Sequence, residues 1–215
     1  EVKDDHGDYR ISLEKYNQFK KENIELVIGP MTSNLAKAVL DAPKSEILFI
    51  SPSMSTNKLI SKDDNFLRVC PLVDSQSDTF LEFIQNKNYG KISIVYDMIN
   101  EEYSKHLSNR IKNKGESLVN KINLISFNSS KNNIEKKSNK DILNSDAVLI
   151  ISQATNTAFI SQKIFNESPS TDLYSVSWSM TKDLIKYGGN AIERMHLIGI
   201  YKPKNPTERY LDFKK

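Results

Sequence analysis

The sequence predicts an α/β protein in which short strands alternate with amphipathic helices. Strand-sized apolar runs recur along the 215 residues, for example at 47–50 and 147–151, and none is long enough to span a bilayer. The stretches between them carry apolar residues three or four positions apart, as helices do. Most runs are continuously apolar, which is typical of strands covered on both faces. These observations predict doubly wound parallel sheets.

The elements follow one another in a regular order. Strands are predicted at residues 26–28, 47–50, 66–69, 92–96, 119–127, 147–151, 173–177 and 196–201. Helices are predicted at residues 11–23, 33–42, 75–86, 101–113, 134–144, 155–165 and 181–186. The second helix begins at a capping residue, either Thr32 or Ser33, and ends before Pro43.

Two proline-containing segments divide the chain into lobes. Pro71 and Pro203 each follow a predicted strand that a proline cannot continue, so we expect the chain to cross between lobes there. This gives a partial first lobe at 1–73, a second lobe at 74–201 and a returning crossover at 202–215. The first lobe has only two or three predicted strands, fewer than an open doubly wound lobe usually contains. It is therefore predicted to be incomplete.

Composition and motifs argue against several functional classes. The net charge of +3 is spread over the chain without a basic cluster, so no nucleic-acid partner is expected. The single cysteine, Cys70, cannot form an intramolecular disulfide or a cysteine-based zinc site. No nucleophile elbow, phosphate loop, dinucleotide-binding glycine motif or HExxH motif occurs. The acidic run at residues 4–8 is interpreted as a solvated turn at the end of a terminal strand. We predict no metal, cofactor or catalytic residue, although a triad can be assembled in space without a sequence motif.

Two hydroxyl-rich turns follow consecutive predicted strands. The first contains Thr32 and Ser33, and the second contains Ser53 and Ser55. The carboxyl ends of parallel strands meet at one edge of a sheet, where open α/β proteins bind ligands. A helix N-terminus beside a serine hydroxyl suits a carboxylate, whereas carbonyls and hydroxyls of the second turn can accept from an ammonium. The alternative is that these serines are only caps and turn formers.

Six segments carry a resemblance to a known family, in this order: VIGPMTSNLAKAV, ILFISPSMSTN, FLRVCPLVDSQSD, KISIVYDMINEEYSKHL, DAVLIIS and VSWSMTKDLIKYGGNAIERM. From a strand at Val2 to Tyr201, the chain resembles the amino-acid-type substrate-binding proteins of ABC transporters, such as the leucine/isoleucine/valine binders. The resemblance implies the type 1 periplasmic binding fold, whose two lobes close on a small ligand. It also implies a non-enzymatic receptor in the periplasm or outside the cell, which delivers an amino acid or similar carboxylate to a membrane permease.

The resemblance also implies ligand contacts for individual residues. Ser33 matches the serine that binds the ligand carboxylate, and Ser53 and Ser55 match positions that hold the carboxylate and the ammonium. Tyr103 matches a tyrosine that closes over the ligand; its position in a helix would by itself suggest a packing aromatic. Gln153 or Ala154 matches another position that lines the pocket.

One position departs from the family pattern. The branched-chain binders place an acidic residue after the strand predicted at 173–177, where it pairs with the ligand ammonium, but Trp178 follows here and the nearest acid is Asp183. A buried ammonium without a carboxylate partner is costly. Either Asp183 or another acid takes over, or the ligand is not a standard α-amino acid. Trp178 is expected to stack on the ligand, cover a cation, or belong to the core.

The second departure is length. The first strand and first helix of the family have no counterpart before Glu1, and the return through the first lobe is cut off after Lys215. We therefore expect a fragment, with any signal peptide before Glu1, and possible self-association through unpaired strand edges of the first lobe. Two other functions stay open. A ligand-sensing domain of a membrane signalling receptor would share the fold and site, and a flavodoxin-like enzyme would need a polar triad or a phosphate loop.

Overall fold

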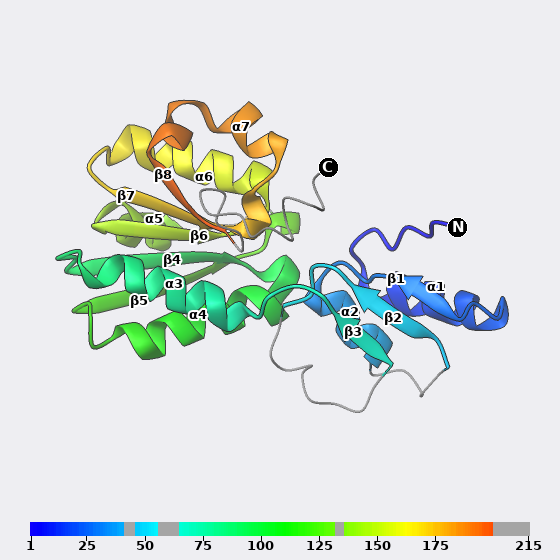
Figure 1. The fold of residues 1–215 in the computed structure, drawn as a ribbon. Helices are drawn as coiled ribbons and strands as arrows, with labels where there is room; N and C mark the ends of the chain where they lie inside the picture. Colours follow the sequence, from blue (N-terminus) through cyan, green and yellow to red (C-terminus); the bar gives the residue numbers. More distant parts are fainter. Residues whose placement is uncertain (41–45, 56–64, 132–135, 200–215) are drawn as a thin grey trace, which may run out of the picture.

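The computed structural model of the protein describes residues 1–40, 46–55, 65–131 and 136–199. It contains two parallel sheets, one of three strands and one of five, that lie side by side with helices around them (Figure 1). We call the part built on the three-stranded sheet the first lobe and the part built on the five-stranded sheet the second lobe. The predicted α/β class with parallel sheets is confirmed.

The described helices of the first lobe lie on one side of its sheet. Its strands β1 (Leu26–Ile28), β2 (Leu48–Ser51) and β3 (Phe66–Arg68) pair in the order β1-β2-β3. The helices α1 (Tyr9–Lys21) and α2 (Ser33–Leu40) pack against one face of this sheet. The buried residues between them are Tyr16, Ala36, Val39, Ile47, Phe49, Met54 and Phe66.

The second lobe is larger and its sheet is covered on both faces. Its main elements are α3 (Val73–Gln85), β4 (Lys91–Asp97), α4 (Glu101–Gly115), β5 (Lys121–Phe127), α5 (Lys136–Leu143), β6 (Ala147–Ile151), α6 (Ala154–Glu167), β7 (Asp172–Val176), α7 (Lys182–Gly188) and β8 (Met195–Ile198). The strand order is β5-β4-β6-β7-β8, with every pair parallel. Phe80 and Leu107 show that α3 and α4 pack on one face, and Ile142 and Ile164 show that α5 and α6 pack on the other.

This strand order places β4 and β6 side by side. The order reverses between β4 and β6, so the connections that follow these strands leave in opposite directions and open a crevice at their carboxyl ends. Two of the short 3₁₀ turns that follow strands are η2 (Met98–Asn100) after β4 and η4 (Ser177–Ser179) after β7. These turns face the first lobe and supply part of the site described below.

The structure corrects two of the sequence expectations. The expected strand at Val2 is absent, because the carboxylates of Asp4 and Asp5 accept hydrogen bonds from the backbone N–H groups of His6 and Gly7 and turn the chain. The sheet of the first lobe is not covered on both faces: Ile28 is 77% exposed, and no described element covers that face. The remaining strands and helices match the predictions to within a few residues.

The chain passes from the first lobe to the second through residues 69–72, between β3 and α3. The second expected crossing, with Pro203 and the returning segment 202–215, lies outside the described residues. None of the helices in the described ranges combines the length and the apolar character needed to cross a membrane.

Candidate functional site

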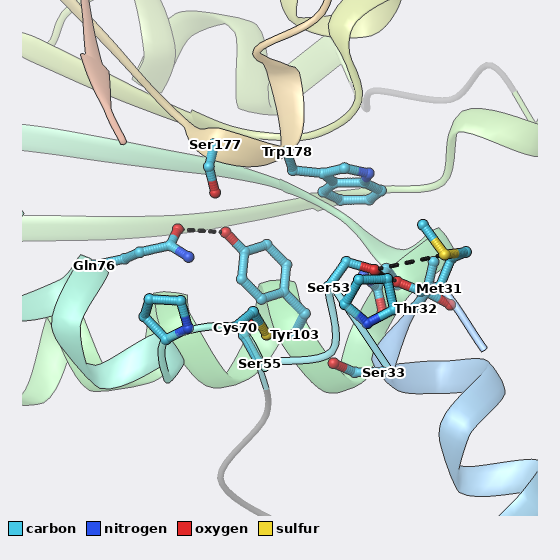
Figure 2. A pocket seen from close by; sticks show the side chains of 13 residues that line it. Met31, Thr32, Ser33, Ser53, Ser55, Cys70, Gln76, Tyr103, Ser177 and Trp178 are labelled. Carbon is cyan, nitrogen blue, oxygen red and sulfur yellow. Dashed lines mark hydrogen bonds between the residues drawn. The ribbon is translucent and has the colours of Figure 1, made fainter. Parts of the chain in front are cut away.

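A cavity of about 300 Å³ lies between the lobes at the carboxyl ends of their strands. Figure 2 shows Ser177 and Trp178 on one side, the serines of the first lobe on the other, and Tyr103 between them. The cavity is lined by Met31, Thr32, Ser33, Pro52, Ser53, Ser55, Cys70, Pro71, Gln76, Asn100, Tyr103, Ser177 and Trp178. Both lobes therefore contribute to one site.

The turn between β1 and α2 presents a helix N-terminus to the cavity. Gly29 has φ +140°, a conformation that L side chains rarely adopt, and it turns the chain out of β1. Of the two residues predicted as the helix cap, Thr32 has this role, because its Oγ1 accepts a hydrogen bond from Leu35 N at 3.4 Å. Ser33 is 2% exposed, and its hydroxyl has no hydrogen-bond partner among the described residues. This hydroxyl is available to a ligand.

The turn after β2 is fixed against the first turn. Ser51 Oγ donates a hydrogen bond to Pro30 O at 2.8 Å and accepts one from Met54 N at 3.2 Å. Ser53 Oγ donates to Met31 O at 2.5 Å, so this hydroxyl is already engaged. Ser55 is buried, and its hydroxyl has no partner within the described part of the chain. The two turns thus form one rigid wall with two free hydroxyls.

The second lobe contributes two aromatic residues in contact with each other. Tyr103 and Trp178 meet edge to face, with ring centroids 5.9 Å apart and an interplanar angle of 88°. The Tyr103 hydroxyl donates a hydrogen bond to Gln76 Oε1 at 2.7 Å (Figure 2). Burial raises the pKa of Tyr103 above its ordinary value, so its phenol stays protonated at neutral pH and remains a donor. Trp178 packs on the core, which is one of its predicted roles, and it also faces the cavity, where its contact with a ligand stays a prediction.

The chain crossing between the lobes forms one wall of the cavity. Cys70 and Pro71 line it, and Cys70 Sγ donates a hydrogen bond to Met54 O at 2.7 Å. Burial raises the pKa of the Cys70 thiol, so this cysteine is a neutral packing group rather than a thiolate nucleophile at physiological pH.

None of the described residues that line the cavity is charged. Asp183, predicted as a possible partner for an ammonium, is exposed and lies outside this set. Asp97, at the end of β4, is fully buried but accepts hydrogen bonds from Ile99 N, Ser129 N and Ser152 Oγ at 2.9–3.2 Å. Its carboxylate therefore organises the end of the second-lobe sheet. No three His, Cys, Asp or Glu side chains in the described ranges are grouped to hold a metal ion.

The cavity brings together most of the residues that the sequence nominated. Thr32, Ser33, Ser53, Ser55, Tyr103 and Trp178 all line it. Gln153 and its alternative Ala154 do not, because Gln153 is the exposed residue before α6 and its side chain makes no capping hydrogen bond. Sequence reasoning missed Gln76, Asn100 and Ser177. Ser177 could have been found from its place directly after a strand, whereas Gln76 and Asn100 reach the cavity only through tertiary packing.

Comparison with known proteins supports this description. A family profile described as the receptor family ligand binding region matches residues 1–188. No curated protein matches the sequence. Among solved structures, the leucine binding protein LivK from Thermotoga maritima is similar, with 20% identity and a TM-score of 0.83 over 99% of this chain and 63% of that one.

Two further structures are similar over most of this chain. The branched-chain amino acid transporter substrate-binding protein LivJ from Streptococcus pneumoniae, solved with isoleucine, has 15% identity and a TM-score of 0.71, covering 87% of this chain and 54% of that one. An ABC transporter solute-binding protein from Rhodopseudomonas palustris, solved with benzoate, has 15% identity and a TM-score of 0.70, covering 88% and 53%.

The chain thus spans less than two thirds of the length of each of these proteins. The likenesses confirm the type 1 periplasmic binding fold that the sequence resemblance implied. The profile match extends over most of the residues that form the two lobes and the cavity between them. The chain belongs to the family of receptor ligand-binding regions.

Proposed function

We propose that this chain is the ligand-binding part of an extracytoplasmic solute receptor that captures an amino acid or a similar small carboxylate for ABC import. The observation that carries the proposal is the cavity between the lobes, whose polar groups are uncharged and whose aromatic wall comes from the second lobe. Such a cavity binds by shape and hydrogen bonding. A membrane permease is the proposed partner.

A carboxylate fits the first-lobe side of the cavity. The N-terminus of α2 carries a partial positive charge, and the buried Ser33 hydroxyl lies beside it with no described partner. Ser55 adds a second free hydroxyl. Hydrogen bonds to a charged group are stronger than neutral ones, so these groups favour a carboxylate over an amide. The two similar proteins solved with isoleucine and with benzoate both hold carboxylates.

Apolar side chains from both lobes suit an apolar ligand body. Trp178, Pro52 and Met31 are available for contact with an aliphatic or aromatic group. No acid among the described lining residues faces a ligand ammonium, so removing the ammonium should cost little affinity. The proposed ligands therefore include carboxylates that lack an amino group.

A thermal-shift panel tests the ligand chemistry directly. The panel compares leucine, 4-methylpentanoate and benzoate with leucinamide and benzamide, each at millimolar concentration. We expect the carboxylates to raise Tm by a few degrees and their amides to leave it unchanged, because a ligand that binds only the native state stabilises it. Stabilisation by the amides alone, or by no member of the panel, would contradict the proposal.

Substitution of Ser33 tests where the carboxylate binds. Ser33→Ala should weaken binding of the best carboxylate roughly tenfold or more, the usual effect of losing a hydrogen bond to a charged group. Ser12→Ala is the matched control, because Ser12 is also a buried first-lobe serine but does not line the cavity. Calorimetric titration measures both. Equal affinities of the two variants would place the carboxylate elsewhere.

A further inference from the structure

The two helices that point at the cavity from opposite lobes are joined by hydrogen bonds at their N-termini. Asn34, the second residue of α2, donates from its Nδ2 to Ile99 O at 3.0 Å. Its Oδ1 accepts a hydrogen bond from Glu102 N, the second residue of α4, at 3.0 Å. In return, Asn100 Oδ1 accepts a hydrogen bond from Asn34 N at 3.3 Å.

These bonds cap α4 from the other lobe and add a second cap to α2, which already has Thr32 as its own. Asn100 occupies the capping position of α4, yet its side chain makes no hydrogen bond to its own helix. The early N–H groups of a helix have no partner within the helix and need an outside acceptor. Here the acceptor for α4 is a side chain of the first lobe, and an acceptor for α2 is a side chain of the second lobe. Each lobe therefore supplies a hydrogen-bond acceptor to the N-terminus of a helix in the other lobe.

This contact lies at the edge of the cavity. Asn100 lines the cavity, and Asn34 directly follows Ser33, which also lines it. Lys37 Nζ lies 3.7 Å from Glu102 Oε1 and adds an ion pair between the same two helices. Separating the lobes would break all of these interactions at once. Each capping bond would then have to be replaced by water.

We propose that Asn34 and Asn100 are positioning residues that hold the two lobes in the arrangement seen in the structure, because the side chain of each one caps a helix of the other lobe. The pair fixes how far the α2 N-terminus lies from Tyr103 on α4, and so sets the width of the cavity. The inference rests on the contact itself and does not depend on the nature of the ligand.

Amide exchange measured by NMR on the whole chain without ligand tests the pair. Asn34→Ala, a first-lobe change, should speed exchange of the Glu102 amide in the second lobe about fivefold, the fold-change expected for one lost cap. Asn100→Ala should likewise speed exchange of the Asn34 amide, whose acceptor it removes. Asn17→Ala is the control, because Asn17 is an exposed asparagine of the first lobe on α1. It should change neither amide.

A second measurement separates lobe positioning from local helix stability. Small-angle scattering should show a larger radius of gyration for Asn34→Ala than for Asn17→Ala, while amides in β4 and β6 keep their protection. Asn34→Asp keeps an oxygen acceptor for Glu102 N and should restore much of the protection of that amide. Unchanged Glu102 exchange in Asn34→Ala, or unchanged scattering, would overturn the proposal. Because no ligand is added, either result is independent of the carboxylate assignment.

Discussion

The two lobes differ in how much of their sheets they bury. In the second lobe, every residue of β6 is buried between helices on both faces. In the first lobe, β1 is half exposed or more at both ends, because α1 and α2 pack on one face only. Burial of apolar area is the main source of stability, so the second lobe is the more stable scaffold. The wall with the two free hydroxyls, Ser33 and Ser55, by contrast, belongs to the less buried lobe.

The contrast explains why the contacts between lobes matter. The hydroxyl turns of the first lobe are ordered locally by Ser51 and Ser53, which bond to the neighbouring turn. Their position relative to Tyr103 and Trp178 depends on the connection at Pro71 and on the Asn34 contacts. A binding site made by one well-buried lobe and one partly covered lobe is therefore sensitive to changes that leave the second lobe intact.

The largest expected effect is on the free energy of unfolding, when a buried isoleucine of the second-lobe sheet is replaced by alanine and an exposed one of the first-lobe sheet serves as the comparison. Ile150→Ala in β6 should destabilise the protein by about 2–5 kcal/mol, because Ile150 is fully buried. Ile28→Ala in β1 should change stability by less than about 0.5 kcal/mol, because that side chain is 77% exposed. Urea unfolding followed by fluorescence of Trp178, the only tryptophan, measures both. Similar losses would show that the first-lobe face is covered in solution.

The reactivity of Cys70 reports on the boundary between the lobes. Its partial burial and raised pKa predict slower alkylation by iodoacetamide than that of a free thiol at pH 7. The rate should rise with pH as the thiolate forms, and a bound carboxylate should slow it further because Cys70 lines the cavity. Mass spectrometry follows the reaction, with urea-unfolded protein as the control. Fast labelling of the native protein would argue against the placement of Cys70 between the lobes.

The exposed apolar face of the first lobe should bind a fluorescent dye, and changing it should have a smaller effect than the changes above. Leu26, Ile28 and Leu67 are each more than half exposed on the short strands β1 and β3. Ile28→Lys combined with Leu67→Lys should lower the fluorescence of bound anilinonaphthalene sulfonate without lowering stability. Exposed Glu116→Lys in the second lobe is the control for added charge. Unchanged dye binding would mean that the dye binds elsewhere, and destabilisation would mean that the face is packed.

The smallest effect concerns an ion pair that supports the second lobe. The hydrogen bond from Lys114 lowers the pKa of Asp78, with Arg110 contributing to the same shift. A lowered pKa means that the folded state favours the carboxylate, so this stabilisation is present above the ordinary Asp pKa and is lost as pH falls through the lowered value. Asp78→Asn should cost at most about 1 kcal/mol at pH 7, because the carboxylate is half exposed. Urea midpoints at pH 7 and pH 2 should show the difference disappearing in acid, whereas Glu116→Gln should show none.

Local sequence patterns predicted much of this protein. The strand at 147–151 follows from a continuous apolar run, and the turn at Thr32 and Ser33 follows from capping chemistry beside a glycine and a proline. Because parallel strands align their carboxyl ends, the same patterns placed Ser33, Ser53 and Ser55 at one edge of a sheet. These features depend on neighbouring residues, so the sequence by itself determines them.

Tertiary structure decided how these parts meet. The hydrogen bond between Tyr103 and Gln76 and the place of Trp178 in both core and cavity depend on segments far apart in the chain. The exposed face of the first lobe likewise depends on which elements pack against its sheet. The pairing of Asn34 with Asn100 across the lobes is of the same kind, since neither asparagine shows locally that it caps another helix. Such contacts arise from the order of the strands and the packing of the lobes. They bring together residues that no periodic pattern in the sequence relates.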